Sequence, residues 1–366
     1  MNSFNVGGVT NVVKEIYRGI DKTKYKIDFV RCDTNLNDFD KEVLDNGDKI
    51  YYYKPVFLNK IPFYNYYKQR KAITKQILAQ IKGEKYDVIH VHANANIGLY
   101  VGKKAKIPVR ILHFHEAVPD FGDNVNKSFI TKTIWKNRQK KYNRWATVKA
   151  GDSLKACKVK YGEKVVSGPK LCVLYPPIDF NKFNPKNYDK NAVIKKYGID
   201  ESAFNILHVG RLTPVKNQKF IIDVLKEISD TKKAKVYFVG DGECKNELIL
   251  HAEKLGVKDA VEFLPPDTSP DIYLGMNCSL LPSFSEAFGM VAVESQLMGV
   301  RCFCSTNVPS DVDVGGCEFL DLSLDVKIWV EKILAKKEEI ALDKDRVALF
   351  KIESLLKTIE NLYSKI

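Results

Sequence analysis

Two cations close together in the second half of the chain could hold an anionic ligand. Residues 205–212, NILHVGRL, form a strand-like segment that ends in Gly210 and Arg211, and the following TPVKN opens a helix and contains Lys216. Cationic side chains and helix N-termini beyond a strand are common phosphate sites. The spacing therefore predicts that Arg211 and Lys216 contact a diphosphate. The alternative is two solvated loop charges.

Two glutamates eight residues apart occupy residues 281–299, LPSFSEAFGMVAVESQLMG. A strand runs into a loop that contains Glu286, and a helix that starts near Gly289 contains Glu294. Glycine lets a ligand approach the amides of the helix start, where the helix dipole favours anions. The two acids are not expected to share a proton, but they could hold two hydroxyl-rich parts of one long ligand. The alternative is two solvated acids.

Four histidines end two strand-like segments of the first half. His90 and His92 lie in VIHVH, and His113 and His115 lie in ILHFHEA. Residues two apart face the same side of a strand. No carboxylate or cysteine spacing completes a ligand set, so no metal site is expected. His115 is predicted to face a cleft as a hydrogen-bonding group, and the alternative is a set of structural histidines.

Apolar, strand-like segments alternate with helical patterns along the whole chain, which is typical of parallel α/β sheets. The expected strands are 26–31, 87–92, 109–113, 144–148, 171–174, 205–209, 235–239, 260–263, 278–281, 301–304 and 317–319. A Pro- and Asn-rich linker follows residue 175. The pattern predicts two doubly wound, Rossmann-like domains, 1–178 and 179–342, with ligands held in a cleft at the carboxyl ends of their strands. Residues 343–366 form a closing helix. Only six residues precede Gly7 and Gly8, so we expect a shortened first strand.

The net charge of the chain is +13, and its excess is concentrated in one region. Residues 54–149 contain 20 Lys and Arg against five acidic residues. Aromatic residues alternate with these cations in two helical segments, a composition that suits an anionic lipid surface. The residues predicted to face a membrane or an acceptor are Lys68, Arg70, Lys71, Trp135, Lys136 and Arg138. A solvated helix face is the alternative, and the absence of a nucleic-acid motif disfavours DNA or RNA.

The cellular location predicted from the sequence is the cytosol. The chain has no run of 18 apolar residues and no signal-peptide start. Its eight cysteines contain no CxxC pair, so we expect reduced thiols without a zinc site or a disulfide framework.

Taken together and in order, these motifs resemble the retaining glycosyltransferases of family 4, which have the GT-B fold. The resemblance rests on Gly7-Gly8, ILHFHEA, HVGRLTPVKN, VGDGE and the E-x7-E segment from Glu286 to Glu294, and it covers nearly the whole chain. In general character the chain is similar to bacterial capsule and exopolysaccharide transferases.

The resemblance implies a role for each motif. Arg211 and Lys216 would bind the donor diphosphate, and Glu294 would hold the ribose hydroxyls. Glu286 would contact the donor sugar. The remaining implied donor contacts are Gly7, Gly8, Gly210, and the backbone of Phe288, Gly289 and Met290. His115 would face the reacting centre, and the closing helix would cross back to the first domain.

The function implied is transfer of a hexose-type sugar, with retention and without a metal or other cofactor, from a nucleotide donor. The donor would be a UDP-sugar, and the acceptor a lipid-linked oligosaccharide at the inner face of the plasma membrane. Three alternatives stay open: a sugar-nucleotide epimerase or phosphorylase of the same architecture, a non-catalytic subunit that supports a partner transferase, and a basic nucleic-acid binder. The sequence does not specify an oligomeric state.

Overall fold

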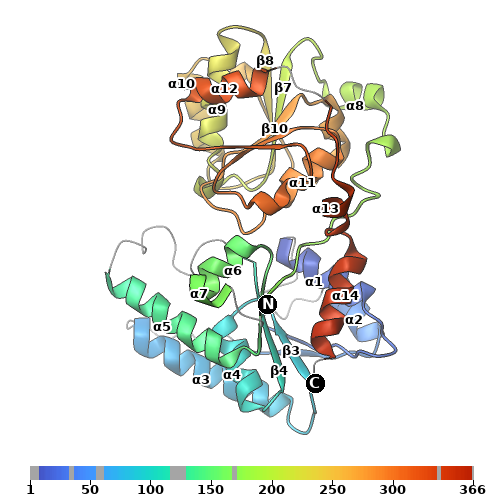
Figure 1. Cartoon of the computed structure of the whole chain (residues 1–366), viewed down its shortest axis with the longest axis vertical. Helices are drawn as coiled ribbons and strands as arrows, with labels where there is room; N and C mark the ends of the chain where they lie inside the picture. The colour runs from blue at the N-terminus through green and yellow to red at the C-terminus, as the bar shows by residue number, and fades with distance from the viewer. Residues whose placement is uncertain are drawn as a thin grey trace. The chain divides into compact units, whose positions relative to one another are not determined.

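The computed structural model describes residues 8–32, 37–54, 62–115, 129–166, 171–335 and 339–364. The chain forms two compact units (Figure 1). The first unit contains Met1–Pro177 and Ile352–Ile366, and the second contains Ile178–Lys351. The sequence placed the domain boundaries after residues 178 and 342, whereas the units change after residues 177 and 351.

The first unit is built on parallel strands. Four form one sheet in the order β3-β4-β5-β6, and two more, β1 and β2, pair with each other. The strands are β1 (Phe29–Arg31), β2 (Ile50–Tyr52), β3 (Val88–Val91), β4 (Val109–Phe114), β5 (Val148–Gly151) and β6 (Leu171–Val173). The helices are α1 (Gly8–Gly19), α2 (Asp38–Asp45), α3 (Pro62–Gln80), α4 (Ala95–Lys104), α5 (Phe129–Trp145), α6 (Leu154–Tyr161), α7 (Glu163–Val166) and α14 (Ile352–Tyr363).

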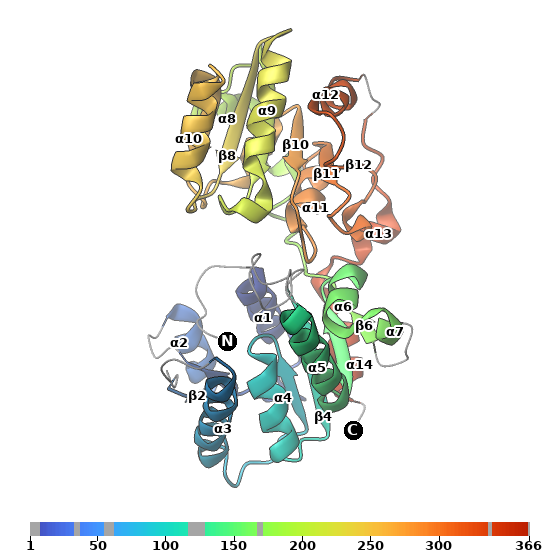
Figure 2. The same ribbon diagram turned by 90° about the vertical axis from the view of Figure 1, so that its left-hand side faces the viewer.

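Helices pack on both faces of the four-stranded sheet because its strands present apolar side chains alternately to each side. Ile111 of β4 packs with apolar residues of α1 and α14. Its neighbour Leu112 packs in a second cluster with Leu99 of α4 and Tyr142 of α5. Figure 2 shows α3, α4 and α5 next to one another. The single closing helix predicted at 343–366 is two helices in the structure. The helix at Lys344–Ala348 lies in the second unit, and α14 lies in the first.

One predicted strand of this unit is misplaced. The strand expected at 144–148 begins only at Val148, because α5 continues to Trp145. The buried side chains of Tyr142, Trp145 and Ala146 lie three and four residues apart, which is the helical period. The strand β2 was not predicted.

The second unit contains one six-stranded parallel sheet in the order β12-β11-β10-β7-β8-β9. Its strands are β7 (Phe204–Val209), β8 (Ala234–Val239), β9 (Val261–Leu264), β10 (Cys278–Leu281), β11 (Cys302–Ser305) and β12 (Cys317–Leu320). The α-helices are α8 (Lys190–Tyr197), α9 (Gln218–Ser229), α10 (Lys245–Lys254), α11 (Met290–Leu297), α12 (Val326–Leu334) and α13 (Lys344–Ala348). Short 3₁₀ helices span Pro185–Asn187, Pro214–Lys216, Lys258–Ala260, Pro270–Gly275 and Ser310–Val312.

Two apolar clusters hold this sheet between helices. Ile206 and Val236 pack with buried residues of α9, α10 and α12. On the other face, Leu207 and Tyr237 pack with α8 and the 3₁₀ helix at Pro270–Gly275. Both units are doubly wound α/β structures, as the sequence predicted. No helix in the described parts of the chain is long and apolar enough to cross a membrane.

Candidate functional site

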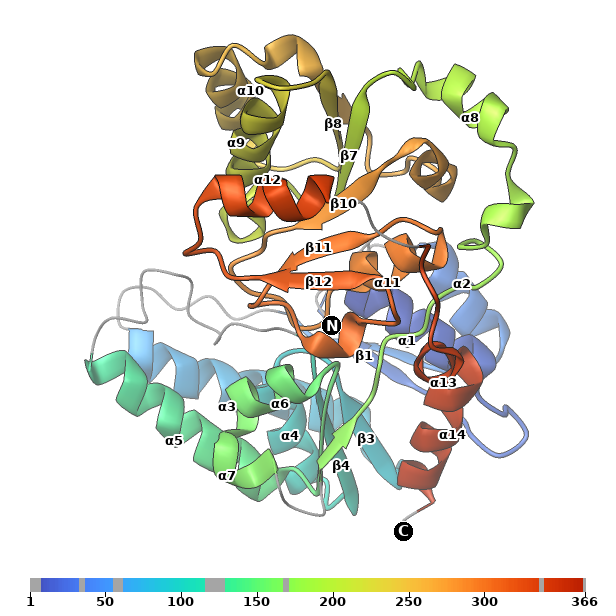
Figure 3. The same ribbon diagram turned by 45° about the horizontal axis from the view of Figure 1, so that its top comes forward.

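The second unit has a topological switch point between β7 and β10. The next two strands in the chain, β8 and β9, lie on one side of β7 in the sheet. The later strands β10, β11 and β12 lie on its other side. Figure 3 shows β7 and β10 together, with α11 below β11. Ligands of doubly wound sheets bind at such points, beyond the carboxyl ends of the strands. Gly210 and Arg211 follow β7, and the loop that contains Glu286 follows β10.

Two glycines allow close backbone approach at this sheet edge. A Cβ atom on Gly240, directly after β8, would lie 2.0 Å from the carbonyl oxygen of Gly210. Gly289 stands immediately before α11 with φ at +102°, a conformation that side chains rarely adopt. Its conformation leads the chain into α11, whose N-terminus carries the partial positive charge expected of helix starts.

Lys216 and Glu286 form an ion pair, although they are 70 residues apart. Lys216 Nζ donates to Glu286 Oε1 at 2.5 Å, and Ser283 Oγ donates to the same oxygen at 2.7 Å. The Lys216 and Glu286 side chains are only 22% and 11% exposed. A backbone hydrogen bond from Phe284 to Val215, 2.8 Å long, joins the two loops. The sequence pointed to both charges but not to their pairing or to Ser283.

The backbone of Arg211 is fixed by two buried side chains that the sequence did not single out. His208 Nδ1 lies 2.9 Å from the carbonyl oxygen of Leu280, so this nitrogen donates, and His208 Nε2 accepts from Gln218 Nε2 at 3.2 Å. Gln218 Nε2 also donates to the carbonyl oxygen of Arg211 at 2.8 Å. Burial lowers the pKa of His208 to about 4, so its ring is neutral at pH 7. The Arg211 side chain itself is exposed.

Glu294 is the fifth of the eight residues of α11, and its surroundings disfavour a charge. Burial raises the pKa of its carboxyl group to about 7, an effect that Lys182 partly offsets. Within the described ranges, the carboxyl group makes no hydrogen bond. A poorly solvated carboxylate gains most from a ligand that donates hydrogen bonds, and a vicinal diol is such a ligand.

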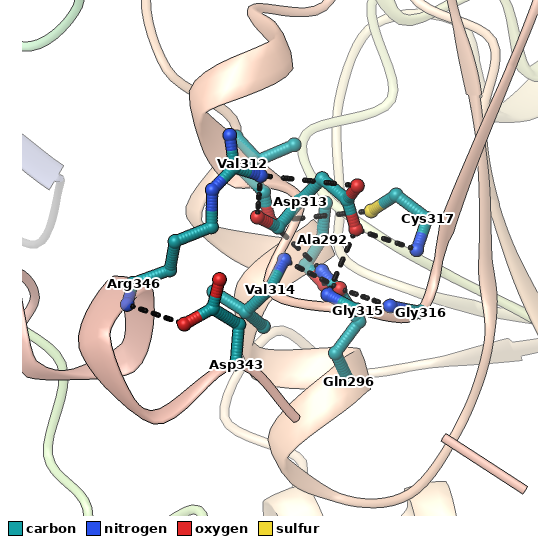
Figure 4. A network of polar contacts seen from close by, with 10 residues as sticks. All are labelled: Ala292, Gln296, Val312, Asp313, Val314, Gly315, Gly316, Cys317, Asp343 and Arg346. Carbon is teal, nitrogen blue, oxygen red and sulfur yellow. Dashed lines mark hydrogen bonds and ion pairs between the residues drawn. The ribbon is translucent and has the colours of Figure 1, made fainter. Parts of the chain in front are cut away.

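The helix that carries Glu294 is held by the amide of Gln296 (Figure 4). Gln296 Oε1 accepts from the backbone nitrogens of Val314 and Gly316 at 2.9 and 2.8 Å. Gln296 Nε2 donates to the carbonyl oxygens of Ala292 and Val312, both at 2.8 Å. All the hydrogen-bonding capacity of this fully buried amide is used, which fixes α11 to the loop before β12.

Phe288 belongs to the core rather than to a binding surface. Its side chain is buried, and its ring centroid lies 5.4 Å from that of Phe350. Phe288 could therefore contact a ligand only through its backbone, next to the backbone of Gly289 and Met290. Of the predicted glycines in the first unit, Gly7 lies outside the described residues. Gly8 is the first residue of α1, and a Cβ atom added there would have no described atom within 4 Å.

The first unit brings the four predicted histidines together on one face of its sheet. His92 Nδ1 lies 2.9 Å from His115 Nε2, and His115 Nδ1 lies 2.9 Å from Asp152 Oδ1. His113 Nε2 contacts the same carboxylate at 3.1 Å. His90 Nδ1 contacts the hydroxyl group of Tyr363 in α14 at 2.9 Å. Both nitrogens of His115 are thus engaged inside this cluster.

Asp152 is the member of the cluster that sequence reasoning missed. It directly follows β5, the neighbour of β4, and the misplaced strand at 144–148 had hidden that position. The expectation that no carboxylate joins the histidines is therefore wrong. Burial raises the pKa of Asp152, but His115 and His113 outweigh it and lower the value to about 2. Burial lowers the pKa of His113 to about 4 and also lowers the pKa values of His90 and His92 well below the ordinary histidine value.

Within the described residues, this cluster contains two groups of three side chains that could bind a metal ion. One group is His90, His92 and His113, and the other is His113, His115 and Asp152. In each group the possible ligand atoms lie within 4.8 Å of one another. In the second group, the contacts to Asp152 already use the facing nitrogens. A third group is formed by the thiols of Cys302, Cys304 and Cys317, because β11 and β12 pair Cys302 with Cys317. The cysteines are free thiols. A metal-free site stays a prediction.

One of the predicted membrane-facing residues is misassigned. Arg70 is 7% exposed, and its Nη1 donates to Asn96 Oδ1 at 3.1 Å. Its guanidinium carbon lies 4.5 Å from the ring centre of Tyr100 and 5.4 Å from that of Trp145. Arg70 therefore packs between α3, α4 and α5. Lys68, Lys71 and Lys136 are exposed and Arg138 is half-buried, while the side chain of Trp135 lies outside the described residues.

The chain matches two protein families. Residues 6–179 match Glycosyltransferase Family 4, and residues 189–314 match Glycosyl transferases group 1. EpsF of Bacillus subtilis (strain 168), a relative that is named as a glycosyltransferase, is 24% identical to this chain. The match covers 91% of this chain and 85% of EpsF.

Solved structures share the fold at low sequence identity. The crystal structure of Anabaena Alr3699/HepE in complex with UDP-glucose has a TM-score of 0.76 at 17% identity, covering 100% of this chain and 98% of that one. The apo lipopolysaccharide outer core galactosyltransferase WaaB has a TM-score of 0.68 at 15% identity, covering 100% and 98%. The chain belongs to the family 4 glycosyltransferases of the GT-B fold, as the sequence motifs predicted.

Proposed function

We propose that this glycosyltransferase transfers a hexose-type sugar, with retention, from UDP to a lipid-linked oligosaccharide during exopolysaccharide or capsule synthesis. The observation that carries the donor part is the set of charged groups at the switch point of the second unit. A paired Lys216 and Glu286 and an exposed Arg211 lie in the loops that follow β7 and β10, and a poorly solvated Glu294 lies in α11, the next helix after β10. The UDP-glucose in the Anabaena structure supports a nucleotide-sugar donor.

Each group has a separate task in this proposal. Arg211 and Lys216 bind the diphosphate, Glu294 accepts hydrogen bonds from the ribose hydroxyls, and Glu286 contacts the sugar. The amides that start α11, from Phe288 to Met290, face the phosphates.

Lys216 and Glu286 already contact each other, so a bound donor would add hydrogen bonds to this ion pair rather than bind between the two side chains. An ammonium group has three protons, so Lys216 can keep Glu286 as a partner and donate to a phosphate oxygen. Glu286 has a second carboxylate oxygen, which can accept from a sugar hydroxyl. The pair thus holds the two ends of the bond that breaks.

Charge stabilisation by the chain itself would replace a metal. As the bond between sugar and phosphate breaks, negative charge grows on the diphosphate. Two fixed cations and a helix N-terminus oppose that charge, and one such group contributes about 10²–10³ in rate. We propose no carboxylate nucleophile, which agrees with attack by the acceptor from the face that the diphosphate leaves.

The acceptor part of the proposal rests on charge. Lys68, Lys71 and Lys136 are exposed cations in the basic region of the first unit, and each cation near an anionic membrane contributes about 1 kcal/mol. We therefore propose that the protein acts at the inner face of the plasma membrane.

A thermal-shift panel of UDP-, GDP- and ADP-sugars tests the donor assignment. UDP-sugars should raise the Tm of the wild-type protein, since a ligand at 100 times its Kd stabilises by about 2.7 kcal/mol. The shift should vanish in Glu294→Ala and persist in Glu247→Ala, an exposed glutamate of α10. A shift that Glu294→Ala retains, or no shift with any donor, would contradict the proposal.

A further inference from the structure

Backbone pairing between β7 and β10 stops before either strand ends. The last paired residues are Leu207 and Ser279, whereas β7 continues to Val209 and β10 to Leu281. Buried backbone carbonyl groups beyond the last pair need hydrogen-bond donors from another source, because such groups are nearly always paired. At this switch point the donors are side chains.

Three carbonyl oxygens beyond the last backbone pair accept hydrogen bonds from side-chain nitrogens. The contacts are His208 Nδ1 with Leu280 at 2.9 Å, Asn217 Nδ2 with Pro282 at 3.2 Å, and Gln218 Nε2 with Arg211 at 2.8 Å. A carbonyl oxygen can only accept, so each of these nitrogens carries a proton that points at its partner. Side chains thus replace the backbone pairing where the loops of the candidate donor site begin.

The amide of Gln218 has one orientation. Its side chain is buried beside the fully buried ring of His208. One amide proton goes to the carbonyl oxygen of Arg211, and the amide nitrogen also lies 3.2 Å from His208 Nε2. The proton of the neutral His208 ring is on Nδ1, where it meets Leu280, so Nε2 accepts from the second amide proton.

The hydrogen bond from Gln218 completes a set that fixes the backbone of Arg211. Two backbone hydrogen bonds of 2.9 Å hold the residues on either side of Arg211 to the end of β8 and the loop after it, from Gly210 to Val239 and from Leu212 to Asp241. The carbonyl group of Arg211 points to Gln218 instead. The exposed side chain of Arg211 therefore extends from a backbone that is held on two sides.

We propose that Gln218 is a positioning residue that sets the guanidinium group of Arg211 for the donor diphosphate. The inference rests on the proposed function, because it needs Arg211 to bind that diphosphate, and it adds a buried residue that acts through Arg211. Fixed geometry matters for a charge-stabilising group, since a displacement of about 1 Å can cost about 10²-fold in rate. Gln218 also closes the loop 211–217, which contains Lys216.

Histidine-ring ¹⁵N NMR of the full chain tests the orientation of the Gln218 amide without any donor. The His208 signals are assigned by their loss in His208→Asn. We expect wild-type His208 to be protonated on Nδ1 and bare on Nε2. Gln218→Glu places a carboxylate against Nε2, so the pKa of His208 should rise in that variant. A proton on Nε2 in the wild-type protein, or an unchanged pKa in Gln218→Glu, would overturn the inference.

Binding of UDP-glucose to four proteins tests the role of Gln218. They are the wild type, Gln218→Met, Arg211→Ala and the double variant. Methionine has about the length of glutamine but no proton to donate, so Gln218→Met should raise the Kd about 10-fold. In the Arg211→Ala background the same change should alter the Kd less than threefold, because Gln218 acts through Arg211. Equal fold-changes in both backgrounds would show a merely structural role and refute the proposal.

Gln139→Met is the matched control. Gln139 Nε2 donates to the carbonyl oxygen of Val159 at 2.8 Å in the first unit, so this variant loses the same kind of hydrogen bond away from Arg211. Its Kd for UDP-glucose should stay within twofold of the wild-type value. Should Gln218→Met fail to fold, Gln218→Asn takes its place, because its amide is one methylene group too short to reach Arg211 and should weaken binding in the same way.

The outcomes separate this inference from the proposed function. If no nucleotide sugar binds the wild-type protein, the proposed function fails, and the role of Gln218 fails with it. If donors bind and Gln218→Met binds UDP-glucose within twofold of the wild-type Kd, the positioning role is wrong and the donor assignment stands.

Discussion

Replacing Glu294 by glutamine should stabilise the ligand-free protein, and the effect should depend on pH. Burial raises the pKa of this carboxyl group from its ordinary value of 4.5 to about 7 in the folded protein. Below pH 4.5 the group is protonated in both the folded and the unfolded states, so its shift costs nothing. Between pH 4.5 and 7 the unfolded state loses its proton first, and above pH 7 the full cost falls on the folded state.

The shift corresponds to about 3 kcal/mol, and the partial solvent contact of Glu294 reduces this to about 2–3 kcal/mol. Glutamine has the same shape but no charge to bury. A domain of this size gains about 2–4 °C in Tm per kcal/mol. Glu294→Gln should therefore unfold about 5–10 °C higher than wild type at pH 8.5 and about 2 °C higher or less at pH 5.

The assay is thermal unfolding followed by circular dichroism at the two pH values, with Glu247→Gln as the exposed control. Equal Tm differences at both pH values would refute the argument, because they would show that Glu294 does not ionise between them. The same variant should lose the stabilisation by donor, so stability and binding should change in opposite directions.

Three further substitutions test the structure around the sites. Gly240→Ala places a Cβ atom 2.0 Å from Gly210 O, so it should cost more than about 2 kcal/mol and lower Tm and donor binding together, unlike the exposed Glu243→Ala. Arg70→Ala should lower Tm because Arg70 is buried, whereas Lys68→Ala should leave Tm unchanged; a Tm unchanged by Arg70→Ala, with weaker liposome binding, would contradict this packing. Asp40→Asn breaks a pair with Arg31 in which both side chains are fully buried, and urea unfolding should show a loss of about 3–5 kcal/mol; a loss below about 1 kcal/mol would contradict a charged pair.

The sequence predicted the second unit well because local patterns suffice there. Each strand of its sheet is a short apolar run, and the ligand-side residues come directly after a strand end, where a glycine or proline marks the turn. Gly210 and Pro282 are such marks. The pairing of Lys216 with Glu286 could not be predicted, since it depends on which two strands are neighbours, β7 and β10, and on the loop contact behind them.

The first unit was predicted less well, for a physical reason that one segment shows. Residues 144–148, RWATV, have β-type composition, yet Trp145 and Ala146 are buried at the helical period that Tyr142 begins. Tertiary packing outweighed local preference, and the resulting shift of three to four residues hid Asp152. Arg70 was misjudged because a helix with cations on several faces does not reveal which cation turns inward.

The first unit is assembled from the beginning and the end of the chain, and this has a consequence for synthesis on the ribosome. Its core cluster joins Val12 and Ile16 of α1 to Leu355 and Ile359 of α14, whereas the second unit is one continuous segment. The second unit can complete its fold while α14 is still in the exit tunnel, and the earlier-made first unit has to wait with an apolar surface uncovered. The emergence of α14 from the ribosome, rather than the synthesis of the strands of the first unit, then decides when that unit is complete.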